Sequence, residues 1–162
     1  MTQPAAPKAI TVRLCTEEDL PAVRERMAEP QLADVKFELQ EEGDYFFLLG
    51  FVDGELAGNV ILDYRATTKL RPEVRDLWVY VEHRRQGVGA ALSADMEARA
   101  AELGFDEILL GVDPENPAAI PMYISLDYTP TGNHRTVTTR DADGNTHQST
   151  EAIFRKSLHI RR

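Results

Sequence analysis

One segment decides the fold of this chain, and it reads DLWVYVEHRRQGVGAAL from Asp76 to Leu92. Residues 74–81 are dense in β-branched and aromatic side chains, which predicts a strand. Glycines follow at positions 87 and 89, and beyond them apolar residues recur at the spacing of one helix face. That face consists of Val88, Leu92, Met96, Ala100 and Leu103. The segment therefore predicts a strand, a glycine-containing turn and a helix in direct succession.

A turn of this kind is suited to binding an anion. The free N–H groups at a helix start bind phosphate, and glycines let the backbone approach the ligand closely. Arg84 and Arg85 add positive charge in a chain that is otherwise acidic. A dinucleotide fingerprint is excluded because position 92 is not glycine, and a P-loop because Ala90-Ala91 follows Gly89. Two glycines alone are equally compatible with a plain tight turn.

The rest of the chain reads as a mixed α/β (α+β) domain. Asp53-Gly54 and Asp143-Gly144 separate strand-like runs, as in two-residue hairpin turns. After Pro30, an apolar stripe of Leu32, Val35 and Leu39 predicts the buried face of a short helix. We expect strands over 10–15, 46–52, 55–64, 74–81, 108–112, 134–140 and 146–158, and helices over 20–27, 32–39, 88–103 and 118–126. This order predicts a mixed sheet with helices packed on it.

Length and composition favour one ordinary globular domain. The chain has 162 residues, and we expect a flexible tail over 1–8 followed by a single domain over 9–162. The one cysteine, Cys15, excludes an intramolecular disulfide. No apolar run approaches the length of a membrane span, and residues 1–8 lack the core of a secretory signal, so we expect a cytoplasmic protein without membrane contact.

The net charge is −9, from 18 basic and 27 acidic residues. This balance argues against a nucleic-acid partner, which requires a basic surface to neutralise phosphates. An acidic surface attracts cationic amines, although a net charge far from zero also serves solubility alone. The charge therefore mildly favours a cationic small molecule as ligand.

Two motifs resemble those of the GCN5-related N-acetyltransferase (GNAT) family. The stretch Arg84–Gly89 is similar to the family signature Arg/Gln-x-x-Gly-x-Gly/Ala. Downstream, the stretch from Asn116 to Tyr128 is similar to the family segment Asn-x-x-Ala-x-x-x-Tyr-x-x-x-Gly-Phe. The motifs lie in the family order, and the element order agrees over residues 10–158. The resemblance implies a mostly antiparallel central sheet with a splayed strand pair and flanking helices.

The chain departs from the family pattern at a few positions. Asp127 replaces the usual glycine before the final aromatic residue, which is Tyr128 instead of phenylalanine. Aspartate tolerates a left-handed backbone better than most residues, so the turn can persist. Val81 stands where the family often has proline, and Pro121 lies inside the expected short helix, where it can introduce a kink.

The resemblance implies acetyl-coenzyme A as cosubstrate and assigns residues to hold it. The pyrophosphate is expected on the backbone amides of residues 86–90, beside Arg84 and Arg85, and the pantetheine arm along Val79 and Val81. Asn116 is expected to contact the arm, although helix capping explains an asparagine equally well. The complete expected set is Val79, Val81, Arg84, Arg85, Gln86, Gly87, Val88, Gly89, Ala90, Asn116, Ala119 and Tyr123.

The resemblance also implies catalytic roles for direct attack by an amine. The backbone N–H of Val79 is expected to stabilise the oxyanion, and Tyr123 to act as general acid toward the leaving thiolate. Glu73 or Asp76 is the candidate general base, acting directly or through water. Because strand residues alternate, Asp76 and Trp78 should share one face, but which face meets the substrate stays open.

Other chemistries lack support in the sequence. His83, His134, His147 and His159 do not have metal-ligand spacing, and no Cys/His cluster exists, so we expect no metal. No nucleophile elbow is present, so we expect no covalent acyl-enzyme.

The expected activity is acetyl transfer from acetyl-coenzyme A to a primary amine of a small molecule, with the substrate pocket built from residues 20–39 and 129–150. The alternatives are a protein N-terminal or lysine acetyltransferase, a non-catalytic acyl-CoA-binding or sensing module, and a purely structural interaction domain. The family also admits a homodimer, which no feature of the sequence establishes.

Overall fold

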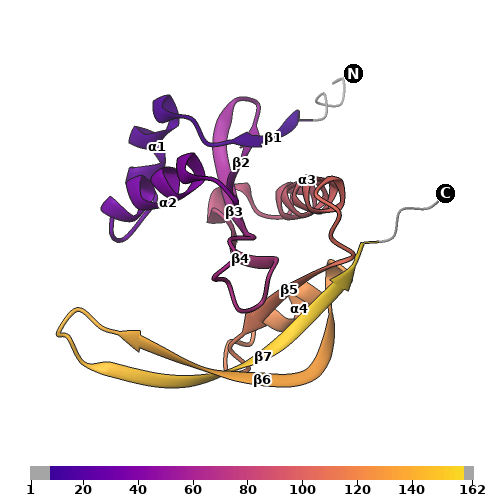
Figure 1. Cartoon of the computed structure of the whole chain (residues 1–162). Coiled ribbons are helices and arrows are strands. Elements are labelled where there is room, and N and C mark those ends of the chain that lie inside the picture. Colours follow the sequence, from indigo (N-terminus) through magenta and orange to yellow (C-terminus); the bar gives the residue numbers. More distant parts are fainter. Residues whose placement is uncertain (1–7, 159–162) are drawn as a thin grey trace.

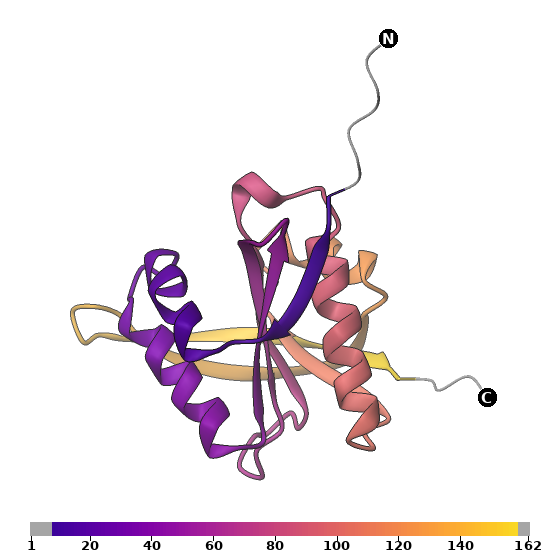
Figure 2. The same cartoon turned by 90° about the horizontal axis from the view of Figure 1, so that it is seen from above.

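The computed structural model describes residues 8–158, so most of the expected tail and His159 lie outside the described residues. Seven strands form one sheet in the order β1-β2-β3-β4-β5-β7-β6, with helices on both faces (Figures 1 and 2). All neighbouring strands are antiparallel except β4 and β5, which are parallel. The mixed, mostly antiparallel sheet agrees with the predicted fold class.

The strands are β1 (Ile10–Leu14), β2 (Tyr45–Val52), β3 (Glu55–Asp63), β4 (Glu73–Val79), β5 (Glu107–Val112), β6 (Thr129–Arg140) and β7 (Thr146–Ser157). The α-helices are α1 (Leu20–Glu25), α2 (Gln31–Glu42), α3 (Val88–Glu102) and α4 (Ala119–Ser125). Two short 3-10 helices cover Glu17–Asp19 and Val81–His83. The second hairpin starts earlier than predicted, because β6 begins at Thr129 instead of residue 134.

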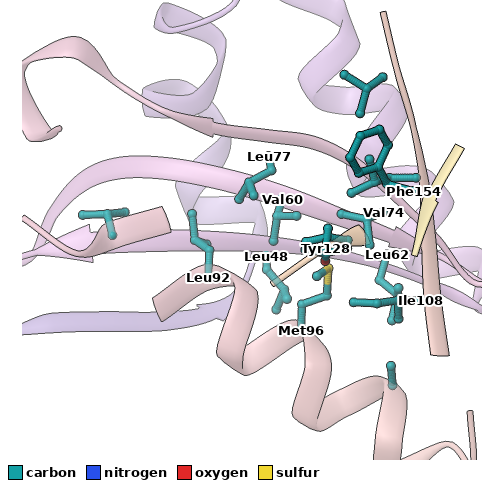
Figure 3. Packing of buried hydrophobic residues seen from close by; sticks show 14 of the residues in the cluster. Leu48, Val60, Leu62, Val74, Leu77, Leu92, Met96, Ile108, Tyr128 and Phe154 are labelled. Carbon is teal, nitrogen blue, oxygen red and sulfur yellow. The ribbon is translucent and has the colours of Figure 1, made fainter. Parts of the chain in front are cut away.

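The core has two parts because the sheet is buried on both faces. Helices α1 and α2 cover one face and α3 covers the other (Figure 2). On the α3 face, Leu92 and Met96 project toward Leu48, Val60 and other strand residues (Figure 3). On the opposite face, α1 and α2 pack against alternate strand residues such as Phe47 and Leu49. Successive residues of β2 and β3 point to opposite faces of the sheet, so their side chains enter the two cores alternately.

The hairpin between β2 and β3 forms at the predicted turn. Asp53 and Gly54 both have positive φ, 50° and 83°, which a two-residue hairpin turn of the type expected for Asp-Gly requires. The Asp53 carboxylate also accepts a hydrogen bond from the N–H of Ala9, at 2.8 Å, and so connects the residue before β1 to this turn.

The prediction for the buried face of α2 was wrong at two of its three positions, since of these only Leu39 packs against the core. Leu32 and Val35, two members of the expected stripe, are exposed. The residues that face the sheet are Ala33, Phe37 and Gln40, also at helical spacing. The Gln40 side chain bridges β1 and β2, because it donates to the carbonyl of Cys15 and accepts from the N–H of Phe47. Gln40 can thus face the sheet because both of its polar groups are hydrogen-bonded to the backbone. A search for apolar residues at helical spacing does not detect such a position.

A bulge in β4 changes which residues share a face. Asp76 has a φ of 53°, and the pairing with β3 shifts between Asn59, opposite Trp78, and Ile61, opposite Arg75. Two residues of β4 therefore oppose one residue of β3. As a result Val74 and Leu77, three positions apart, both enter the α3-side core, which regular alternation would prevent.

Strand β4 also diverges from β5 and ends early. The two strands share one pair of opposed residues, Glu73 and Leu109, so they separate toward the end of β4 that carries the bulge. This separation agrees with the splayed pair that the family resemblance implies. The strand stops at Val79 instead of Val81, since Val81 begins a 3-10 helix. Within the described residues, no helix is both long and apolar enough to cross a membrane.

Candidate active site

The start of α3 carries no side-chain cap. The helix begins at Val88, and its N-cap is Gly87, with a φ of 93°. Such a backbone is strained for any residue with a side chain, which explains glycine at 87. The first hydrogen bond closing on this turn runs from the N–H of Ala91 to the carbonyl of Gly87. The N–H groups of the residues between them have no acceptor inside the helix and are available to an anion.

These N–H groups open onto a cleft of about 690 Å³ between α3, β4 and α4. Gly89, in the first turn, lines this cleft. A Cβ at position 89 would lie 3.6 Å from Cγ2 of Val79, an ordinary contact, so packing within the protein does not demand glycine there. The missing side chain of Gly89 instead keeps the floor of the cleft open to a ligand.

Most residues expected to hold the cosubstrate surround this first cleft. The expected residues along it are Val79, Arg84, Arg85, Gly87, Val88, Gly89, Ala90, Asn116, Ala119 and Tyr123. Val81 and Gln86 are not part of the lining that the structure describes. Val81 is exposed on its 3-10 helix, and Oε1 of Gln86 is buried without a hydrogen-bond partner among the described residues.

Arg84 lies across the mouth of the first cleft. Its Nε donates to the carbonyl of Val79 at 3.0 Å, and its guanidinium lies 4.9 Å from the ring centre of Trp78. Both contacts hold a positive charge at the end of β4, close to the uncapped start of α3. Asn116 has a local role, because its Oδ1 accepts from the N–H of Ala118 at 3.2 Å.

Tyr123 lies where two clefts meet. It is half-buried on α4, and its ring contacts Tyr128 edge-on, with ring centres 5.6 Å apart. Burial raises the pKa of Tyr123 to about 12, and the nearby carboxylates of Asp76 and Glu151 add to the effect. Its side chain lines the first cleft and also a second one. Tyr123, whose hydroxyl stays protonated, thus borders both clefts.

The second cleft has a volume of about 750 Å³ and is lined by charged and hydroxyl side chains. Both base candidates line it, in different states. Glu73 is buried and accepts two hydrogen bonds from Arg135, at 3.2 and 3.0 Å. Asp76 is exposed and pairs with Lys36 of α2 at 2.9 Å. The Glu73 carboxylate is therefore committed to a structural pair, whereas that of Asp76 remains accessible.

The expected substrate segments contribute unequally to the second cleft. The second hairpin supplies residues 135–139 and, just beyond the expected segment, Glu151, whereas α1 and α2 supply none of the lining residues that the structure describes. Sequence reasoning missed Arg65 and Arg75 and did not single out Arg135 within its expected segment, because the three arginines come from separate segments and meet only through strand pairing. In the first cleft it missed six lining residues: Leu77, Trp78, Ala118, Met122, Ser125 and Leu126. The available signal was the four-residue spacing between Met122 and Leu126, which places both on one side of the helical segment.

Comparisons with known proteins agree with this geometry. The sequence model of the acetyltransferase (GNAT) family matches residues 12–128. An acetyltransferase of Pectobacterium atrosepticum is 32% identical over 95 residues, which cover 59% of this chain and 64% of that protein. The chain thus spans just under two thirds of the length of this curated relative.

Solved structures share the fold over nearly the whole chain. An N-acetyltransferase from Staphylococcus aureus has a TM-score of 0.70 at 16% identity, covering 93% of this chain and 99% of that one. The ribosomal-protein-S18-alanine N-acetyltransferase of Escherichia coli has a TM-score of 0.69 at 21% identity, covering 95% and 97%. A Salmonella typhimurium protein solved with its cofactor acetyl-CoA has a TM-score of 0.69 at 17% identity, covering 94% and 96%.

Proposed function

Since this chain belongs to the acetyltransferase (GNAT) family, we propose that it transfers the acetyl group of acetyl-coenzyme A to a primary amine of a small molecule. One observation carries the proposal: Tyr123 lines both the cleft at the uncapped start of α3 and the polar cleft beside it. An enzyme that joins two substrates requires two adjoining sites with a proton-transfer group between them.

The first cleft fits acetyl-coenzyme A. A pyrophosphate suits the uncapped N–H groups of residues 88–90, and the side-chain-free surface of Gly89 admits it. Arg84 and Arg85 would add charge, with Arg84 leaving its contact on Val79 to do so. When bound, the cosubstrate supplies an acetyl group activated as a thioester.

The protein's own groups would manage protons and charge. The backbone N–H of Val79, three residues beyond the bulge at Asp76, would stabilise the negative charge that develops on the thioester oxygen. Asp76 would accept the proton that the amine releases as its nitrogen bonds to the acetyl carbon. Tyr123 would donate a proton to the sulfur as the carbon–sulfur bond breaks. Glu73 would keep its structural pairing with Arg135.

The dimensions of the second cleft support a small acceptor. A volume of about 750 Å³ lies within the range of pockets that bind small molecules, roughly 300–1,000 Å³. Its lining is dominated by charged and hydroxyl groups, which suit a polar amine.

Calorimetry with acetyl-coenzyme A tests the first cleft. We expect micromolar affinity for the native chain, about −8 kcal/mol, and a loss of roughly 100-fold or more in a Gly89→Glu variant. That substitution places bulk and negative charge where the pyrophosphate would lie. Ala98→Glu is the matched control, because Ala98 is exposed on the same helix and lies outside the cleft. Absence of binding by the folded native chain would refute the proposal.

A screen of amines for release of free thiol tests the transfer itself. Turnover with a small amine supports the proposal. Tight binding of acetyl-coenzyme A without turnover of any amine would instead favour a non-catalytic acyl-CoA-binding module.

A further inference from the structure

The second cleft contains an ordered network of charges along one wall. Six side chains alternate in sign and contact one another in sequence: Arg65, Asp63, Arg75, Glu73, Arg135 and Glu151. The contacts include 2.8 Å from Arg65 to Asp63, 3.0 Å from Arg135 to Glu73, and 2.8 Å from Arg135 to Glu151. The network joins residues of β3, β4, β6 and β7 and of the loop after β3.

The two kinds of charge lie at different depths in this wall. The side chain of Asp63 is 1% exposed and that of Glu73 is 5% exposed, whereas Arg65 and Arg75 are 35% and 38% exposed. The carboxylates of Asp63 and Glu73 are thus more deeply buried than the guanidinium groups of Arg65 and Arg75. A buried carboxylate requires a cationic partner. The arginines supply this partner to the buried carboxylates and, being partly exposed, also present positive charge to the cleft.

Two of the arginines keep donors available. Arg65 binds Asp63 through Nε and Nη2, and Arg75 reaches Asp63 through Nη2. Among residues 8–158, no acceptor is found for Nη1 of either arginine. Arg135, in contrast, uses all three of its nitrogens on Glu73 and Glu151. The exposed loop residue Lys69 also lines the cleft and makes no ion pair with a described residue.

The opposite charge gathers near Tyr123. Asp76 is exposed at the bulge of β4, and Glu151 reaches the cleft from β7. Both carboxylates are close enough to Tyr123 to raise the pKa of its hydroxyl. The cleft therefore has two carboxylates beside the proposed acid group, Asp76 paired with Lys36 and Glu151 paired with Arg135, and a cationic region formed by Arg65, Arg75 and Lys69.

We propose that the acceptor is a small zwitterion, an amine that also carries a carboxylate, and that Arg65, Arg75 and Lys69 bind this carboxylate while the amine lies beside Asp76 and Tyr123. Guanidinium groups with spare N–H donors are the preferred protein partners of carboxylates. The inference deepens the proposed function and rests on it. It also reverses the expectation from net charge, since the −9 of the whole chain is not the charge of this cleft.

The test compares amines that differ only in the carboxylate. Glycine, leucine, phenylalanine and β-alanine are each assayed beside their own amides, with spermidine as a purely cationic amine. We expect at least one acid to exceed its amide in kcat/KM by about tenfold or more, because the amide forfeits charge-assisted hydrogen bonds. Equal rates within every pair, or preference for spermidine, would overturn the zwitterion proposal.

Variants then locate the recognition. Lys69→Gln and Arg65→Gln should each raise the KM of the preferred acid about tenfold and leave that of its amide unchanged, while Lys69→Arg restores binding. In Arg65→Gln the buried Asp63 retains Arg75 as partner. Arg155→Gln is the control, since Arg155 lies on β7 outside both clefts and is 56% exposed. An equal effect of Arg155→Gln would refute the assignment.

A binding measurement separates this inference from the proposed function. In the presence of coenzyme A, calorimetry compares N-acetylleucine with N-acetylleucinamide, and the other acids with their amides in acetylated form. Tighter binding of the acids, lost in Lys69→Gln, supports the zwitterion site whether or not turnover occurs. Equal binding overturns it. Missing turnover with selective binding of the acids would instead contradict only the proposed transfer.

Discussion

Replacing Tyr123 by phenylalanine removes one hydroxyl and should lower kcat while leaving the fold intact. The ring would keep its edge-on contact with Tyr128, so we expect the thermal midpoint to stay within a few degrees of the native value. General acids typically contribute about 10²–10⁴-fold to a rate. The surroundings of Tyr123 determine where its contribution to the rate falls within that range.

Burial, with Asp76 and Glu151, raises the pKa of Tyr123 to about 12. A thiol has an ordinary pKa near ~8.5, so proton donation from Tyr123 to a thiolate is uphill by roughly 3–4 pKa units. This hydroxyl is a weak acid, and we expect a loss in kcat near the lower limit, about 10²-fold, which corresponds to about 2.7 kcal/mol.

The raised pKa also sets the pH dependence. The protonated hydroxyl is the active form, and a pKa of about 12 keeps it protonated throughout the neutral and moderately alkaline range. The native rate should therefore rise as the amine loses its proton, without a fall from ionisation of Tyr123 below about pH 11. The phenylalanine variant should show the same profile at a lower level.

The assay is thiol release at saturating acetyl-coenzyme A, with the affinity for acetyl-coenzyme A measured separately by calorimetry. Tyr128→Phe is the control, because Tyr128 lines neither cleft in the described structure. Its buried hydroxyl lies near Ser93 but makes no hydrogen bond of good geometry. An unchanged kcat in Tyr123→Phe, or an equal loss in Tyr128→Phe, would refute the acid role of Tyr123.

Three further predictions concern the framework of the site. Gly58→Ala should cost about 1–3 kcal/mol of stability and lower activity, because the new Cβ would lie 2.5 Å from the carbonyl oxygen of Trp78 beside the bulge; urea unfolding and thiol release measure both, and a neutral result would show that β3 and β4 separate easily there. Met96→Ala should cost about 2–5 kcal/mol in urea unfolding, since the side chain is fully buried in the α3-side core, and a loss below 1 kcal/mol would mean that this core collapses around the cavity. Arg13 lowers the pKa of Asp19 to about 2, so their pairing stabilises the fold above pH ~4 and is lost as pH falls toward 2; Arg13→Gln should therefore destabilise the chain at neutral pH and flatten its acid denaturation, and identical acid transitions would contradict this.

Several elements could be predicted because their signals are local. The Asp53-Gly54 turn is encoded by the two residues that adopt positive φ, and the start of α3 by Gly87 at its N-cap. The spacing of the predicted helix face places Val88, Leu92, Met96 and Ala100 in the core, although its last member, Leu103, is exposed. Such features depend on backbone preferences over a few residues, which the sequence displays directly.

Other features escaped the sequence because they depend on pairing between distant segments. The bulge at Asp76 exists only relative to β3, and it changes which residues of β4 share a face. In α2, Gln40 faces inward because the backbone of β1 and β2 satisfies its amide, while Leu32 is left exposed. In both cases the contacting residues are far apart in the sequence.

The sequence by itself determined the family, the element order and many of the residues that surround the first cleft, because those residues lie in two short contiguous motifs. The tertiary structure decided the character of the second cleft. Its wall joins Asp63 to Glu151 across four strands, and the depth of each charge follows from strand register and from the divergence of β4 and β5. A sum of charges along the chain contains no information on which charges are buried, so only the folded arrangement shows that Arg65 and Arg75 are exposed while their partner Asp63 is buried.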